Sequence, residues 1–290
     1  MTSGVKFEKR GDLTSLRVST PYSECVLFPE QGAHVASFVP HGFDDILWVS
    51  SSSLYESGKA IRGGIPICWP WFGPHPSDSS LPNHGFARVA EWNLDGVEVN
   101  GGEGTTAVAM SLAPSDATRA MWPRDFRLEY VVVVGKTLRC SLTTTNLDDE
   151  PMDLTQALHT YFRVGDVREI GIEGFDGVGY IDALDGFERK IQKGAIRFAG
   201  NVDSVYVASE GGRAIRDESL GRAVRVSKTG SASDVVWNPW REKAMSMFDF
   251  EDDEYLNMVC LETSNAFDDK RVVAPGGSHT VSAEFAVEEL

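Results

Sequence analysis

The sequence predicts an all-β protein, a large antiparallel β-sandwich or barrel with a few short helices. Glycine and proline are frequent, with 28 and 13 among 290 residues, so the segments between these turn formers are short. Many of those segments are rich in β-branched residues and alternate apolar with polar side chains, as in a sheet with one buried face. Helical periodicity is confined to short pieces such as residues 240–247.

The clearest alternation lies in residues 137–145, where Leu138, Cys140 and Leu142 alternate with polar residues. The last segment repeats the pattern over residues 281–287. Further strands are expected, in chain order, at residues 13–19, 33–39, 91–99, 106–112, 127–134, 205–208, 223–226 and 257–262. Turn sequences such as NGGEG and PGGS separate them. Because no linker, charge shift or fixed-period repeat divides the chain, we expect a single domain over residues 1–290.

The charge balance limits the class of partner. Lys and Arg number 27 against 43 Asp and Glu, for a net charge of −16. Nucleic acids and anionic membranes favour basic surfaces, so neither is expected as a partner. An anionic ligand of this protein would need a local cluster of arginines. The expected partner is a small molecule.

Compartment and assembly are inferred from weaker signals. The four cysteines show neither a C-x-x-C pair nor a zinc-like spacing, which favours a reducing compartment. The N-terminal residues MTSGVKFEKRGD lack an apolar signal segment, and the longest aliphatic run, residues 131–134, is far too short to span a membrane. We therefore expect a cytoplasmic protein, with organellar import left open, and a monomer.

Several common catalytic motifs are missing from the sequence. It contains no phosphate-binding G-x-x-x-x-G-K-[ST] loop, no H-E-x-x-H zinc motif and no G-x-S-x-G nucleophile motif. The acidic run at residues 249–254 lacks the central glycine and ligand spacing of a calcium-binding loop. We therefore predict that this run is a solvated face.

The first segment with an unusual composition is residues 61–88, IRGGIPICWPWFGPHPSDSSLPNHGFAR. Its aromatic residues are expected chiefly to pack. Arg62 precedes two glycines and Arg88 follows an Asn-His-Gly turn, so two guanidinium groups occupy constrained positions in an acidic protein. These arginines either form structural ion pairs or bind an anion, and the sequence spacing leaves both readings open.

Two further segments contain single ionisable residues in apolar surroundings. Residues 153–164 predict one strand, with His159 and Tyr161 on the same face. A histidine in such a strand is more often structural than catalytic. Glu262 closes the apolar run at residues 258–261. It is either a partly exposed strand end, which the sequence slightly favours, or a positioned base.

Together these segments resemble the hexose-6-phosphate mutarotase (glucose-6-phosphate 1-epimerase) branch of the aldose 1-epimerase family. The motifs are IRGGIP-x-CWPWFG, HGFAR, ALHTYF and VVWNPW followed by CLE, and the resemblance runs over residues 26–284. It implies a galactose-mutarotase-like β-sandwich with an active site that uses no cofactor and no metal. The implied reaction is the interconversion of the α and β anomers of a hexose 6-phosphate, most of all glucose 6-phosphate.

The resemblance also implies roles for individual residues. His159 matches the general acid and Glu262 the general base of the family. The substrate-binding positions are Arg62, Arg88, His84, Asp203 and, as an aromatic wall of the pocket, Trp237. Asn83 stands where the family has glutamine, and the side chain is one methylene shorter, so contact with the sugar through a bridging water is an alternative to direct contact.

Mutarotation requires a base for the anomeric hydroxyl and an acid for the ring oxygen. We expect Glu262 and His159 to meet across the sugar, from opposite sides of the ring. We also expect His159 to stay protonated near neutral pH because of negative charge from Glu262 and the substrate. Paired arginines favour a phosphorylated sugar. The alternatives are a sugar-phosphate binding or sensing module without turnover, and a mutarotase of unphosphorylated aldoses.

Overall fold

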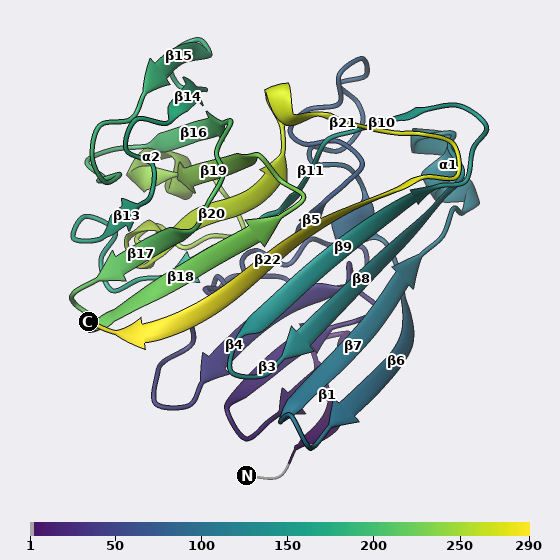
Figure 1. Cartoon of the computed structure of the whole chain (residues 1–290), viewed down its shortest axis with the longest axis horizontal. Helices are drawn as coiled ribbons and strands as arrows, with labels where there is room; N and C mark the ends of the chain where they lie inside the picture. Colours follow the sequence, from purple (N-terminus) through teal and green to yellow (C-terminus); the bar gives the residue numbers. More distant parts are fainter. Residues whose placement is uncertain (1–2) are drawn as a thin grey trace.

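The computed structural model describes residues 3–290, and its regular secondary structure is almost entirely antiparallel sheet (Figure 1). One eight-stranded sheet, here the outer sheet, contains in spatial order β13 (Gly171–Glu173), β17 (Arg213–Asp217), β18 (Arg222–Thr229), β22 (Ser278–Glu289), β9 (Leu138–Asn146), β8 (Phe126–Val134), β7 (Thr105–Leu112) and β6 (Asn93–Asn100). The expected all-β class with a few short helices is confirmed.

A second eight-stranded sheet, here the site sheet, contains β15 (Glu188–Ile191), β14 (Gly179–Asp182), β16 (Val202–Val207), β19 (Ser233–Asn238), β20 (Met258–Asn265), β11 (Gln156–Leu158) and β5 (Ile67–Cys68) in that order. Its eighth strand, β12 (Tyr161–Arg163), also pairs with β20. The site sheet therefore brings together the sequence segments that include His159, Asp203, Trp237 and Glu262.

Smaller elements complete the chain. They are the four-stranded sheet of β1 (Gly4–Arg10), β2 (Leu13–Ser19), β3 (Ser23–Phe28) and β4 (His34–Pro40), the pair β10 (Met152–Leu154) and β21 (Arg271–Val273), the helices α1 (Asp116–Met121) and α2 (Trp240–Met245), and the 3-10 turns η1 (Ala87–Val89), η2 (Glu254–Asn257) and η3 (Phe267–Asp269). No helix within residues 3–290 has the length and apolar character needed to cross a membrane.

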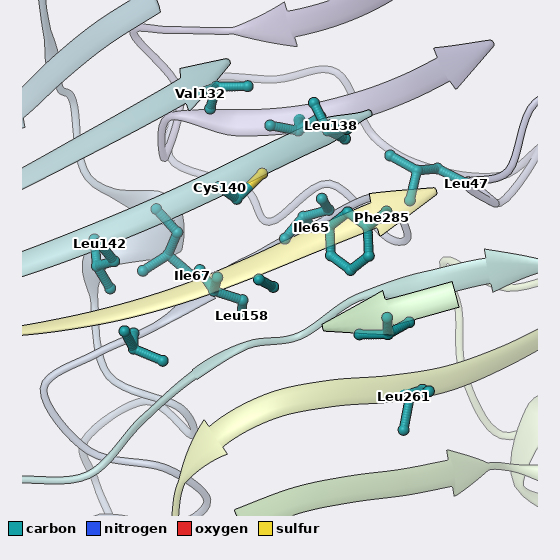
Figure 2. Close-up of a cluster of buried hydrophobic side chains, with 14 of the residues drawn as sticks. Leu47, Ile65, Ile67, Val132, Leu138, Cys140, Leu142, Leu158, Leu261 and Phe285 are labelled. Atoms are coloured by element: carbon teal, nitrogen blue, oxygen red, sulfur yellow. The ribbon is translucent and has the colours of Figure 1, made fainter. Parts of the chain in front are cut away.

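The main core lies between the two large sheets. Figure 2 shows Leu138 and Leu142 of β9 in the same cluster as Leu158 of β11 and Leu261 of β20, and all four are buried. The alternation predicted for residues 137–145 is confirmed, because apolar residues of β9 are buried while Arg139 is exposed. The outer sheet therefore has one apolar and one wetted face.

Strand β20 differs because it is buried at every position on both of its faces. Val259 and Leu261 belong to the main core. Cys260 points to the opposite face and packs in a second cluster with Trp48 and Tyr161. This double burial explains why the sequence of β20 reads as a continuous apolar run and not as an alternating one. Glu262, two residues after Cys260, shares the face away from the main core.

The single strand predicted for residues 153–164 is wrong, because the chain forms three short strands there, β10, β11 and β12. Strand β10 pairs with β21 outside the site sheet, and the segment enters the site sheet only after Thr155, whose backbone N–H donates to Pro70. The pairing of this segment with β20 is interrupted after β11, because the N–H of His159 donates to the carbonyl oxygen of Pro66 and not to β20. The predicted helix at residues 240–247 is also shorter, ending at Met245.

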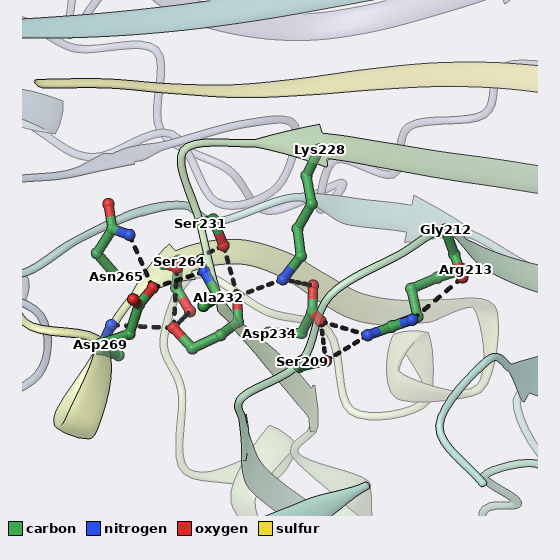
Figure 3. Close-up of polar contacts among 12 residues, drawn as sticks. Ser209, Gly212, Arg213, Lys228, Ser231, Ala232, Asp234, Ser264, Asn265 and Asp269 are labelled. Carbon is green, nitrogen blue, oxygen red and sulfur yellow. Dashed lines mark hydrogen bonds and ion pairs between the residues drawn. The ribbon is translucent and has the colours of Figure 1, made fainter.

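A buried carboxylate ties the two large sheets together (Figure 3). Asp234 of β19 forms two ion pairs. Its Oδ1 atom lies 2.8 Å from Nζ of Lys228 in β18, and its Oδ2 atom lies 3.3 Å from Nη2 of Arg213 in β17. Ser209 also donates to Asp234, at 2.6 Å. The side chains of Asp234 and both cations are at most 3% exposed. Two buried cations therefore depend on one carboxylate for compensation.

We expect Asp234→Ala to lower the free energy of unfolding by about 3–5 kcal/mol, because it leaves two buried cations without a counter-charge. Asp268→Ala is the matched control, since Asp268 pairs with Arg189 on the exposed surface and its loss should change stability little. Urea denaturation of both variants measures the difference. Equal stabilities for the two variants would contradict the role of Asp234.

Candidate active site

His159 and Glu262 lie side by side at the centre of the site sheet. Leu158 pairs with Thr263 and Tyr161 pairs with Cys260, so the same register places His159 opposite Glu262. His159 Nε2 and Glu262 Oε1 are 3.2 Å apart. The two side chains are nearly inaccessible, and Glu262 is 1% exposed. The structure therefore brings together the acid and the base named by the resemblance.

Two features of this pair differ from the sequence-based expectations. Glu262 is not a partly exposed strand end, because β20 continues to Asn265. The two groups also do not meet across a sugar ring, because their contact leaves no room for a ring between them. They face one side of any ligand together. The reason is the cross-strand register, which makes opposite residues project from the same face of a sheet.

The pair keeps unused hydrogen-bonding capacity. Within the described residues, neither His159 Nδ1 nor Glu262 Oε2 has a hydrogen-bond partner, although both atoms are buried. Buried polar atoms in folded proteins are nearly always satisfied, so unpartnered ones are typical of sites that bind or react. Tyr161 restrains the imidazole, because its ring stacks on His159 with centroids 4.9 Å apart and planes 14° apart.

Burial dominates the ionisation of the pair. It raises the pKa of Glu262 well above its ordinary value, and the nearby Asp203 carboxylate raises this pKa further. Burial also lowers the pKa of His159 well below its ordinary value, and the positive charges of Arg88 and Arg62 lower this pKa further. The expectation that His159 stays protonated near neutral pH is therefore wrong here, because desolvation and the nearby arginines favour the neutral ring, and Glu262 itself resists ionisation.

Arg62 reaches the site from a turn that requires glycine. Gly63 has φ of 115°, and a Cβ there would lie 2.3 Å from the carbonyl oxygen of Trp48. The Arg62 Nε and Nη2 atoms each lie 3.1 Å from Asp249 Oδ2, and Nη1 donates to the Tyr161 hydroxyl at 3.1 Å. The structural ion pair considered for Arg62 is therefore present, yet its side chain stays 25% exposed and keeps N–H donors on both Nη atoms.

The prediction that residues 249–254 form a solvated face is wrong for Asp249, the ion-pair partner of Arg62. Asp249 is buried, whereas Asp252 and Asp253 are exposed as expected. Phe250, next to Asp249, packs against Trp48 with ring centroids 4.9 Å apart. Phe250 anchors the start of this run in the protein, whereas Phe248 on the other side of Asp249 is exposed. An aromatic residue inside the acidic run was therefore the sequence signal that could have identified Asp249.

Arg88 is oriented by the backbone and not by a carboxylate. Its Nη2 donates to the carbonyl oxygen of Asn83 at 2.8 Å. Among the described residues, no carboxylate lies within ion-pairing distance of Arg88. Asn83 is exposed, and it contacts Arg88 through its main-chain carbonyl oxygen and not through its side-chain amide. Arg88 therefore remains available to an anionic ligand.

His84 occupies a strained left-handed turn beside His159, with ring centroids 5.6 Å apart. Its φ is 66°, and the following Gly85 passes so close to Trp69 that no Cβ would fit there. The N–H of Gly73 donates to His84 Nδ1 at 3.3 Å, which leaves the proton of the neutral ring on Nε2. Burial, with repulsion from Arg88 and Arg62, lowers the pKa of His84 to about 3. His84 is therefore a neutral hydrogen-bond donor.

Asp203 and Trp237 lie in one row across the site sheet. Asp203 pairs with Trp237, Trp237 with Cys260, and Cys260 with Tyr161. Cross-strand partners project from the same face of a sheet, so the side chains of this row lie next to Glu262 on the face that carries the site. Burial raises the pKa of Asp203, and the Asp182 carboxylate adds to this rise. The Trp237 ring meets the His159 ring at 6.4 Å and 75°.

The other aromatic residues of residues 61–88 have the packing role that their composition predicts. Trp69 is fully buried, and its Nε1 donates to Thr144 at 2.9 Å. Trp71 is 5% exposed and donates to the carbonyl oxygen of Pro82. Phe72 is partly exposed and meets the edge of His84.

One cluster has the composition of a metal site. Potential ligand atoms of His159, Cys260 and Glu262 lie within 4.8 Å of one another, and all three residues are buried. A metal ion there would engage both residues that the resemblance names as acid and base. Sequence reasoning placed Tyr161 on the face of His159 but gave it no part in the site. It missed Cys260, because an apolar strand gives no sign of which face meets a site.

Comparison with known proteins identifies the family. The family model "Aldose 1-epimerase" matches residues 15–286. The chain belongs to the aldose 1-epimerase family. It is 37% identical over 260 residues to an Escherichia coli K12 protein named "Putative glucose-6-phosphate 1-epimerase", an alignment that covers 87% of this chain and 83% of that protein.

Solved structures agree with the assignment to the aldose 1-epimerase family. The crystal structure of a protein described as a "putative mutarotase" from Salmonella typhimurium superposes with a TM-score of 0.92 and 32% identity, covering 99% of this chain and 94% of that chain. A galactose mutarotase-like protein from Clostridium acetobutylicum has 14% identity and a TM-score of 0.75, covering 100% and 99% of the two chains, and so shows the fold. The expected galactose-mutarotase-like sandwich is confirmed.

We expect Glu262→Gln to stabilise the protein increasingly as pH rises. The unfolded chain ionises Glu262 around its ordinary pKa of 4.5, whereas the folded protein resists ionisation because its pKa is raised. The contribution of Glu262 to the free energy of unfolding therefore decreases as pH rises from 4.5 through the pKa of the folded state. The glutamine side chain of the variant does not ionise, so the variant does not undergo this decrease. Melting temperatures of both proteins from about pH 4.5 to about pH 8 measure this trend. A difference that does not change with pH would contradict the buried position of Glu262.

Proposed function

We propose that this aldose 1-epimerase family member interconverts the α and β anomers of a hexose 6-phosphate, with glucose 6-phosphate as its principal substrate, and uses no cofactor. The observation that carries the proposal is the 3.2 Å contact between His159 Nε2 and Glu262 Oε1, beside Arg62 and Arg88. The name of the Escherichia coli relative supports the phosphorylated substrate. Pure binding or sensing would not need an acid paired with a base.

The proposed reaction opens and recloses a cyclic hemiacetal. Glu262 takes the proton of the anomeric hydroxyl while His159 donates a proton to the ring oxygen, so that neither oxygen develops a full charge alone. Both oxygens are bonded to the same carbon, which suits an acid and a base that lie side by side. After rotation about the C1–C2 bond, the aldehyde recloses on its other face and both protons return. Each group of this kind typically contributes about 10²- to 10⁴-fold in rate.

The remaining residues are assigned to substrate binding. Arg62 and Arg88 hold the phosphate through charge-assisted hydrogen bonds. Asp203 accepts a hydrogen bond from a sugar hydroxyl, and the neutral His84 donates one. Trp237 packs on the apolar face of the sugar. Asn83 acts by orienting Arg88 through its carbonyl oxygen, at 2.8 Å.

We further propose a single domain over residues 1–290, because the main core takes side chains from both large sheets and from β2–β4. The net charge of −16 supports a small-molecule partner without nucleic acid or membrane. Four buried free cysteines support a cytoplasmic location. A monomer is the proposed assembly.

The activity is tested by adding the protein to freshly dissolved α-glucose 6-phosphate and following the anomers by NMR. We expect equilibration much faster than in a protein-free sample, and slower equilibration of α-glucose at the same concentration. Binding of glucose 6-phosphate without acceleration would support a sensing module. Equal acceleration of both sugars would support a mutarotase of unphosphorylated aldoses. Either result contradicts the proposal.

Two substitutions separate chemistry from binding. Glu262→Gln should lower kcat by about 10²- to 10⁴-fold with little change in substrate affinity, because it removes the base. Arg88→Ala should chiefly raise KM for glucose 6-phosphate, because it removes a phosphate ligand. Arg139→Ala, at an exposed position of β9, is the matched control and should change neither constant. The reverse pattern for the first two variants would contradict their assigned roles.

A further inference from the structure

A stack of three rings holds the imidazole of the catalytic pair. Tyr161 lies between Trp48, with ring centroids 5.8 Å apart and planes 24° apart, and His159, at 4.9 Å and 14°. The edge of Trp237 closes the side of the stack at 6.1 Å from Tyr161. Tyr161 is 2% exposed. The plane of the His159 ring is therefore set by a residue that itself has little freedom to move.

The hydroxyl of this tyrosine connects the stack to the arginine proposed to bind phosphate. Tyr161 accepts a hydrogen bond from Arg62 Nη1 at 3.1 Å. Asp249 holds the other side of the same guanidinium through Nε and Nη2, each at 3.1 Å. An anion on Arg62 is thus one hydrogen bond and one ring stack away from the catalytic imidazole.

The charges that face His159 come from several elements. Glu262 of β20 contacts its Nε2 atom, while His84, Arg88 and Arg62 come from the segment of residues 61–88. Both arginines disfavour the protonated imidazole, and Arg88 favours the ionised form of Glu262. Asp203, from β16, disfavours ionisation of Glu262. In the unliganded protein, burial therefore favours a proton on Glu262 and a neutral His159.

A bound phosphate changes this balance because it is a dianion close to both arginines. Its negative charge offsets both arginines that disfavour the His159 imidazolium, whereas only one of them, Arg88, also favours the Glu262 carboxylate. Offsetting both cations therefore favours the imidazolium more than it disfavours the carboxylate. The proton needs to cross only the 3.2 Å between Glu262 Oε1 and His159 Nε2. The product of that transfer is the carboxylate base and the imidazolium acid that the reaction uses.

We propose that the phosphate of the substrate activates the catalytic pair as well as anchoring the sugar. When the dianion binds Arg62 and Arg88, the O–H bond of Glu262 breaks, an N–H bond forms on His159, and no proton enters from solvent. Tyr161 acts as the positioning residue that keeps the imidazole in line with Arg62 and Glu262. This inference rests on the proposed function and explains why discrimination against unphosphorylated sugars would appear in kcat as well as in KM.

The test supplies the phosphate separately from the sugar. The substrate is α-xylose, which lacks the C6 arm, and the added dianion is inorganic phosphite. We expect phosphite to accelerate protein-catalysed mutarotation of xylose by about 10- to 1000-fold, the range given by a pKa change of one to three units. A protein-free sample with equal phosphite corrects for catalysis by the dianion itself, and Glu262→Gln should show no activation.

A second readout does not depend on turnover. With ¹⁵N-labelled histidine, the resonances of His159, identified by their loss in His159→Gln, should change from neutral to protonated imidazole at saturating phosphite. Tyr161→Phe keeps the ring stack but removes the hydroxyl, so both the activation and the ¹⁵N change should diminish. Tyr206→Phe is the matched control, because this buried tyrosine donates instead to Gln192 at 2.9 Å; it should retain both responses.

The outcomes distinguish this inference from the function on which it rests. Rapid turnover of glucose 6-phosphate, with xylose unaffected by phosphite and His159 neutral throughout, would overturn the activation and leave the proposed function standing. Failure of phosphite to bind at any concentration would also overturn it, because the inference requires a dianion site at Arg62 and Arg88. No turnover of glucose 6-phosphate would contradict the proposed function itself.

Discussion

The removal of His159 and Glu262 from water is the constraint on which the rest of the site depends. Their strands lie in the middle of a sheet that is covered on both faces, so both side chains are almost completely shielded from solvent. His159 Nε2 and Glu262 Oε1 lie 3.2 Å apart. In such surroundings the charged forms are disfavoured, and small changes in nearby charge have large effects on where a proton resides. A pair of this kind is suited to exchanging protons with a bound ligand without forming lasting ions.

The fold produces this arrangement through cross-strand register and not through sequence proximity. The same register that pairs Leu158 with Thr263 and Tyr161 with Cys260 sets His159 against Glu262. The next row of the sheet adds Asp203 and Trp237, while residues 61–88 bring the arginines over the same face. Each contributor is held by a local device, such as the glycine turn after Arg62 or the buried carboxylate of Asp249.

The sequence predicted the all-β class and many strands, because alternation is a direct consequence of one buried face, as β9 illustrates. It failed where both faces are covered, so Glu262 looked like a strand end and residues 153–164 looked continuous. Asp249 was assigned to solvent because a charge run reveals nothing about the packing of its aromatic neighbours. The ionisation of His159 was wrong because burial and the positions of two distant arginines cannot be read from spacing. Single-domain organisation and the roles of the site residues stay predictions.

The most direct test of the account is a crystal structure of the protein soaked with glucose 6-phosphate. We predict that the phosphate contacts Arg62 and Arg88, and that the anomeric hydroxyl and the ring oxygen both face the His159–Glu262 pair from one side. A sugar whose C1 lies away from this pair, or a phosphate bound by other residues, would contradict it.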